Sequence, residues 1–170
     1  LFFLVHFVLI SLTFPLSELF TNTPLFYIDN GYHWYTLKMH THLLADTSKI
    51  IYDPFFNAGY PFGFFTDTSA NIAKLLNWWL PDSFTEIQVW KLYVFLASIL
   101  APFLPALGLM LLKFDEKQIL IGCMLSFLLW WTGWFHWFQT AGMTSYVLGG
   151  VFSFFVVCYV VYAHRNITLI

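Results

Sequence analysis

Titratable side chains gather in one short stretch, LFYIDNGYHWYTLKMHTH, in a chain whose charged residues make up only 9% of the total. They are Asp29, His33, Lys38, His40 and His42. A carboxylate and an imidazole four residues apart lie one helical turn apart, so both can contact the same bound molecule. Asp29 is also placed to cap a helix that begins near Gly31, because a carboxylate accepts the free N–H groups of a first turn. The two roles are compatible, and the sequence leaves both open.

The histidines do not have the spacing of a metal site. His40 and His42 would point to nearly opposite sides of a helix, and His33 and His40 lie two turns apart. His136 and His164 fall near opposite ends of different apolar runs, so they cannot clamp one haem. We expect neither haem nor a structural metal, and a divalent cation stays possible.

A second group of polar side chains lies in the segment YDPFFNAGYPFGFF. Asp53 precedes Pro54, which favours an extended or turn conformation, and Asn57 and Tyr60 follow within a turn rich in Gly and Pro. The Asp53 carboxylate could satisfy N–H groups of the loop, and the rings could anchor the loop at the lipid headgroups or stack on a sugar. His136, at the end of a later apolar run, is a candidate wall of the same site.

The composition indicates an all-α integral membrane protein. Hydrophobic residues make up 59% of the chain and aromatic residues 22%, which leaves too little polar surface for a soluble globule. No basic run suggests a nucleic-acid partner. The two cysteines, Cys123 and Cys158, lie in apolar runs and are typical of small core residues. Lipids are therefore the expected surroundings.

About four membrane-spanning helices are predicted, because each needs about 20 mostly apolar residues. They cover residues 1–16, 87–112, 119–138 and 146–163. Residues 17–86 would form a structured external loop containing amphipathic helices near residues 31–45 and 70–80. In the second of these helices, the apolar stripe comprises Ile72, Leu75, Leu76 and Trp79.

Two local signals lie around the second predicted span. Ser83 and Glu86 have the spacing of a capping box, so they predict where the helix starts. Pro102 and Pro105 predict a kink near Ala101, because proline removes a helical hydrogen bond.

The few positive charges predict the orientation. Lysines in KFDEKQ and the arginine in AHRN mark the cytoplasmic side, so residues 17–86 are expected on the opposite side. Because the chain opens on Leu1 rather than Met, we also expect it to be part of a longer protein.

The order of motifs resembles a known family. An aspartate four residues before a histidine (Asp29, His33) is followed by Tyr-Asp-Pro and by Asn-x-Gly-Tyr-Pro, ending at Pro61. This pattern resembles the N-terminal part of polytopic glycosyltransferases of the GT-C fold. The resemblance is closest to bacterial membrane proteins labelled 6-pyruvoyl-tetrahydropterin synthase-related and to YfhO-like proteins. Most GT-C enzymes have many more spans, so the chain would be a fragment or a shortened relative.

The resemblance implies a specific chemistry. The enzyme would transfer a sugar, with inversion, from a polyprenyl-phosphate donor at the external face of a bacterial inner membrane. Asp29 would be the general base, and His33 or Lys38 would contact the departing phosphate. Asp53 and Asn57 would bind the sugar or shape the loop.

Two other functions compete with this one. A non-catalytic accessory subunit of a larger membrane complex also fits an apolar chain, and such a subunit would tolerate Asp29→Asn. A transporter fragment fits less well, because the last three predicted spans contain no acidic residue for ion coupling.

Overall fold

The computed structural model describes residues 2–25, 28–43, 52–53, 60–61, 68–132 and 141–167. The chain divides into two compact units. Unit 1 comprises Leu1–Leu16 together with Val94–Ile170, and unit 2 comprises Ser17–Tyr93. The described residues are mainly helical, as expected, and they include one pair of two-residue strands.

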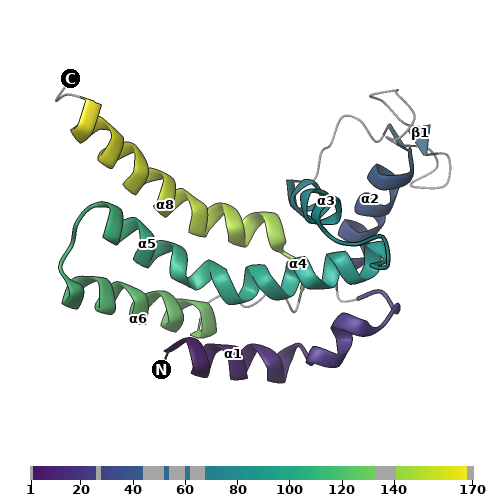
Figure 1. Ribbon diagram of the computed structural model, residues 1–170, viewed down its shortest axis with the longest axis horizontal. Coiled ribbons are helices and arrows are strands. Elements are labelled where there is room, and N and C mark those ends of the chain that lie inside the picture. The colour runs from purple at the N-terminus through teal and green to yellow at the C-terminus, as the bar shows by residue number, and fades with distance from the viewer. Residues whose placement is uncertain are drawn as a thin grey trace. The chain divides into compact units, whose positions relative to one another are not determined.

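Unit 2 contains the segment expected to be external. It includes the 3-10 helix η1 (Leu16–Phe20), helix α2 (Asn30–Leu43), helix α3 (Thr68–Trp79) and the first half of α4 (Glu86–Leu100). Helices α2 and α3 pack together, as Figure 1 shows. Strands β1 (Tyr52–Asp53) and β2 (Tyr60–Pro61) pair antiparallel, with Asp53 opposite Tyr60.

Helix α4 starts with a capping box that differs from the predicted one. The helix begins at Glu86, so its N-cap is Thr85 rather than Ser83. The Thr85 amide donates to Oε1 of Gln88 over 3.0 Å, and the Gln88 amide donates to Oγ1 of Thr85 over 3.4 Å. Ser83 lies inside a turn closed by a bond from the Phe84 amide to the Pro81 carbonyl, which displaces the helix start by two residues.

Unit 1 is a set of apolar helices. It contains α1 (Phe2–Thr13), the second half of α4, the 3-10 turn η2 (Ala101–Phe103) and α5 (Leu104–Leu111). Helices α6 (Glu116–Thr132) and α8 (Thr144–Ile167) complete it. Helix α5 contacts both α6 and α8, and the three helices run alongside one another in Figure 1.

Glycine permits the close approach of α5 to α8. A Cβ atom added at Gly108 would lie 3.0 Å from Sγ and 3.2 Å from Cβ of Cys158, which is tighter than ordinary van der Waals contact. At Gly149, on α8, an added Cβ would meet nothing within 4 Å. Gly108 is therefore a packing requirement, whereas Gly149 is not.

The α-helix is interrupted at the position of the predicted kink, and a histidine hydrogen-bonds the backbone there. The chain passes from α4 through the 3-10 turn η2 into α5 at Pro102 and Pro105. Pro102 has no N–H to offer the carbonyl of Ser98, four residues earlier. Nε2 of His6, on α1, lies 3.0 Å from that carbonyl oxygen and hydrogen-bonds it.

His6 is itself held by several neighbours. Its side chain is buried, and the Trp131 indole donates to its Nδ1 over 3.1 Å. Since Nδ1 accepts this bond, Nε2 carries the proton that goes to Ser98. The imidazole also meets Phe127 edge-on, with ring centroids 4.9 Å apart. His6 is therefore a structural residue of unit 1.

The structure supports the membrane prediction only in part. Among the described residues, two helices are long and apolar enough to cross a membrane: Glu86–Leu111, which includes the kink, and Tyr146–Asn166. Helix α1 is apolar but has only 12 residues. The third predicted span begins in α6, and residues 133–138 of it lie outside the described residues.

Candidate functional site

The start of α2 carries the candidate catalytic carboxylate. Asp29 immediately precedes the helix, and its carbonyl accepts the first intrahelical bond, from the His33 amide over 3.1 Å. The backbone of Asp29 thus occupies the N-cap position. Its side chain is exposed, and within the described part of the chain its carboxylate makes no hydrogen bond. This carboxylate is available to a bound molecule.

The residue before Asp29 has an unusual backbone. Ile28 has a φ of 46°, in the left-handed region that β-branched residues rarely adopt. Its side chain is exposed, so no buried contact of that side chain compensates the strain. Such conformations are found at functional sites and persist only when their surroundings fix them. Here the conformation sets where the chain turns into α2.

Trp90 of α4 fixes the first turn of α2 within unit 2. The indole of Trp90 donates to Oδ1 of Asn30 over 3.2 Å, and both residues are buried. The His33 ring stacks on the same indole, with centroids 5.4 Å apart and an angle of 28° between the planes. His33 therefore lies one turn after Asp29 with its ring held in place.

Two buried donors follow Asp29 on α2. Nδ2 of Asn30 and Nε1 of Trp34 are both buried, and neither has a hydrogen-bond partner among the described residues. They lie four residues apart, so they belong to the same face of the helix. Buried donors without an acceptor are costly, and those in native structures usually bind water or a ligand.

An ion pair in unit 2 joins a buried lysine to a partly exposed glutamate. Lys91 follows Trp90 on α4, and its side chain is completely buried. Nζ of Lys91 lies 2.9 Å from Oε2 of Glu18 on η1, and it also donates to the hydroxyl and carbonyl oxygens of Thr21. Because the ammonium donates to three oxygens, its burial is compensated. The pair joins the segment around η1 to α4.

The ion pair also changes the titration of Glu18. Hydrogen bonds from Lys91 and from the Thr21 hydroxyl lower the pKa of Glu18 below its ordinary value of 4.5. The side chain of Glu18 is 37% exposed, so water and salt weaken this effect.

The remaining predicted site residues do not all converge. Lys38 is exposed, and its Nζ lies 5.6 Å from the centre of the Trp34 ring, a cation–π contact that keeps it along α2. Asp53 and Tyr60 are brought opposite each other by β1 and β2. Asn57 and His136 lie outside the described residues.

The sequence interpretation missed the contacts that organise unit 2. Asn30, Trp90 and the Glu18–Lys91 pair were not singled out. One signal was available, because Lys91 is a charged residue inside a 26-residue apolar helix, and such a residue usually needs a partner. The identity of that partner, 73 residues away, had no local signal.

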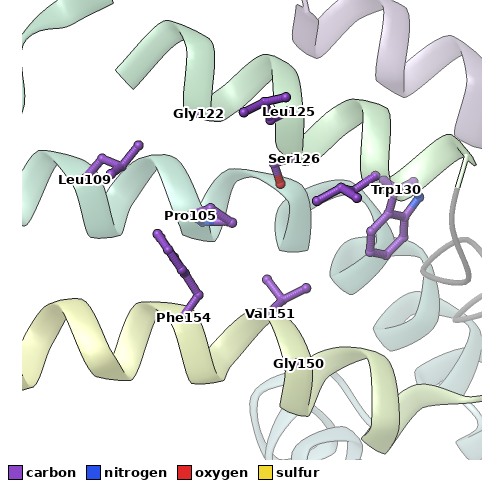
Figure 2. Close-up of a pocket in the computed structure, with 10 residues that line it drawn as sticks. Pro105, Leu109, Gly122, Leu125, Ser126, Trp130, Gly150, Val151 and Phe154 are labelled. Carbon is purple, nitrogen blue, oxygen red and sulfur yellow. The ribbon is translucent and has the colours of Figure 1, made fainter. Parts of the chain in front are cut away.

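Two cavities lie elsewhere in the described residues, and neither is lined by Asp29 or His33. The first, of about 280 Å³, opens between α5, α6 and α8 (Figure 2). Its lining is almost wholly apolar, with the Ser126 hydroxyl as an exception, and it holds no acid, base or charged nucleophile. Such a lining suits a hydrocarbon chain and lacks the groups that catalysis would need.

The second cavity, of about 350 Å³, lies between the end of α3 and the start of α4, and it is mainly polar. Asp82 and Glu86 contribute carboxylates to it, and Asn77 contributes an amide. No group of three or more His, Cys, Asp or Glu side chains that could hold a metal occurs in the described part of the chain.

The chain was compared with known proteins. No protein-family model matches it, and neither does any curated protein or solved structure.

Proposed function

We propose that this protein is a membrane glycosyltransferase of the GT-C type, or a part of one, that takes a sugar from a polyprenyl-phosphate donor. The four predicted spans would be α1, the kinked α4–α5 helix, the span beginning in α6, and α8. Residues 17–86 would face the non-cytoplasmic side of a bacterial inner membrane. The two apolar helices in the described residues support the membrane part of the proposal.

One observation carries the catalytic part. The exposed carboxylate of Asp29 is followed by two buried donors, Nδ2 of Asn30 and Nε1 of Trp34, that lack protein acceptors in the described residues. A base followed along the chain by hydrogen-bond donors suits an oxygen-rich substrate such as a sugar phosphate. His33, held on Trp90, adds an imidazole one turn from Asp29.

In this proposal Asp29 accepts the proton of the acceptor hydroxyl as that oxygen attacks the anomeric carbon. The bond between that carbon and the phosphate oxygen breaks, and the phosphate leaves with the electron pair. Attack from the opposite face inverts the anomeric carbon. His33 or Lys38 would interact with the charge on the departing phosphate, and Asp53 and Asn57 would bind sugar hydroxyls or shape the loop.

The test is a transfer assay on the full-length protein in its native membranes. Membranes are incubated with polyprenyl-phosphate hexoses labelled in the sugar, and the loss of label from the lipid is measured. Asp29→Asn should reduce the rate by about 10²-fold or more, as expected for loss of a general base. Asp115→Asn, which changes an exposed carboxylate before α6, is the matched control and should leave the rate unchanged. Equal rates for Asp29→Asn and wild type would exclude Asp29 as the base.

A second function is favoured by a different observation. Only 22% of the most apolar window of helix Tyr146–Asn166 is buried, which leaves a long apolar face for lipid or for another protein. An accessory subunit of a membrane complex would use this face. In that case Asp29→Asn would be harmless, whereas Val156→Lys or Tyr159→Lys on the exposed face would dissociate the complex.

A further inference from the structure

Helix α3 exposes two tryptophans on one face. Trp78 is 70% exposed and Trp79 is 87% exposed, and Leu75, one turn before them, is 51% exposed. These three residues lie at i, i+3 and i+4, so they share one side of the helix. We call them the α3 face.

The face differs from the apolar stripe expected from the sequence. On another side of α3, Ala73 is completely buried and Leu76 is half-buried, where the helix packs in unit 2 against α2. The packing therefore uses only part of the apolar surface of this helix. Leu75 and Trp79 of the predicted stripe remain outside the protein core.

The short linker between α3 and α4 limits how far the α3 face can lie from the start of α4. Six residues, Leu80–Thr85, separate α3 from α4, and they form a turn closed by a bond from the Phe84 amide to the Pro81 carbonyl. Seven Cα steps reach at most about 24 Å, so Trp79 stays within that distance of Glu86. Glu86 is the first residue of the apolar helix that we propose to cross the membrane.

The side chains are those that prefer the headgroup layer. Tryptophan is enriched at membrane–water interfaces, because its ring is apolar and its N–H can donate to lipid or water. Nζ of Lys74 lies 6.0 Å from the centre of the Trp78 ring, so a positive charge flanks the face. An ammonium in that position can reach lipid phosphate while its alkyl chain lies along apolar surface.

We propose that the α3 face lies in the lipid headgroup layer and anchors unit 2 to the membrane. Leu75, Trp78 and Trp79 enter the boundary between headgroups and acyl chains, and Lys74 stays at phosphate level. The inference uses the proposed membrane crossing by α4 and α5, and it does not require glycosyltransferase activity.

The test places spin labels on single cysteines in the full-length protein, in a Cys123→Ala, Cys158→Ala background. The protein is reconstituted in vesicles of phosphatidylcholine and phosphatidylglycerol. Collision of each label with oxygen, which concentrates in hydrocarbon, is compared with collision with a water-soluble nickel chelate. Labels replace Leu75, Trp78 and Trp79 in turn, and Asp82, an exposed residue of the linker, serves as the matched control.

We expect the oxygen-to-nickel ratio at the α3 face to be roughly tenfold that at Asp82, as suits a helix whose apolar face enters the headgroup boundary. A label at Leu107, exposed on the proposed span, should give a still higher ratio. Ratios at the α3 face equal to that at Asp82 would place the face in water and overturn the proposal. Protection from both reagents would show that protein covers the face, and this would overturn it as well.

The side chain of Lys74 gives a second readout. With Lys74→Gln, the ratio at Trp78 should fall in vesicles containing phosphatidylglycerol and stay the same in vesicles of phosphatidylcholine alone. If Lys74→Gln leaves the ratio at Trp78 unchanged in both kinds of vesicle, an interaction of Lys74 with anionic lipid is excluded.

Discussion

The imidazole of His6 hydrogen-bonds the carbonyl of Ser98 across 3.0 Å, and this is the carbonyl that Pro102 leaves without its helical partner. A kink inside an apolar helix exposes a polar backbone group where water is scarce. In lipid every such group must be satisfied within the protein. His6 satisfies it here from a separate helix, so the break in α4 and the packing of α1 depend on each other.

We predict that His6→Leu destabilises unit 1 by about 1–3 kcal/mol, because it leaves a buried acceptor unpaired. The loss should be smaller in a Pro102→Ala background, since the alanine introduced there has an N–H that can bond the Ser98 carbonyl. The free energy of unfolding in detergent, measured for the two single variants and the double variant, gives the coupling. His164→Leu, at an exposed position of α8, serves as the control. Strictly additive effects would show that His6 does not serve the kink.

The ion pair of unit 2 predicts an acid-sensitive structure. Because the pKa of Glu18 is lowered in the folded state, its stabilising effect is complete above the ordinary value of 4.5. This effect is lost as the pH falls below 4.5 and through the folded-state pKa. The protection factors of the η1 amides, which correct exchange for its intrinsic dependence on pH, should therefore fall in acid, and Glu18→Gln should remove that fall. Glu116→Gln, which changes an exposed carboxylate of unit 1, should leave it unchanged.

The two partners of the pair should not be equivalent. Glu18→Gln leaves a completely buried ammonium without its counter-charge, whereas Lys91→Met leaves a carboxylate that is 37% exposed and can be hydrated. We expect Glu18→Gln to cost more, but less than the roughly 3–5 kcal/mol seen when a fully buried pair is broken, because solvent screens the partly exposed glutamate. The double variant should recover part of that loss. Thermal unfolding of the four proteins is the measurement, and equal losses for the two single variants would contradict the asymmetry.

Two glycines of unit 1, Gly108 and Gly149, should respond differently to substitution. Gly108→Val should destabilise the protein by about 1–3 kcal/mol, because even the first added carbon meets Cys158. Gly149→Ala should be neutral or stabilising by up to about 1 kcal/mol, since alanine favours the helix and the space is open. Unfolding midpoints in detergent distinguish them. A tolerated Gly108→Val would show that α5 and α8 can separate at no cost.

Local signals in the sequence predicted local structure. The kink was predictable because proline lacks an N–H whatever surrounds it. The start of α4 was predicted two residues too early, because Ser83 and Glu86 fit the capping pattern as well as Thr85 and Gln88 do. Only the turn that closes at Phe84 decides between the two pairs.

Contacts between distant residues were not predictable in the same way. Asp29 and His33 were linked by helical spacing, and the structure places both at the start of α2. Neither the stacking of His33 on Trp90 nor the bond of Lys91 to Glu18 produces a periodic pattern in the sequence. A single sequence shows its composition and the spacing of its apolar residues. Contacts such as these depend on which surfaces meet after folding.

The order of the Glu18–Lys91 pair along the chain has a consequence for synthesis. Glu18 precedes Lys91 by 73 residues, so at about 5–20 residues per second it leaves the ribosome roughly 4 to 15 s earlier. When the apolar helix that contains Lys91 emerges, the carboxylate that will neutralise it is already present. Lys91, whose ammonium is costly to bury, is thus synthesised after Glu18, so its partner is always present when it appears.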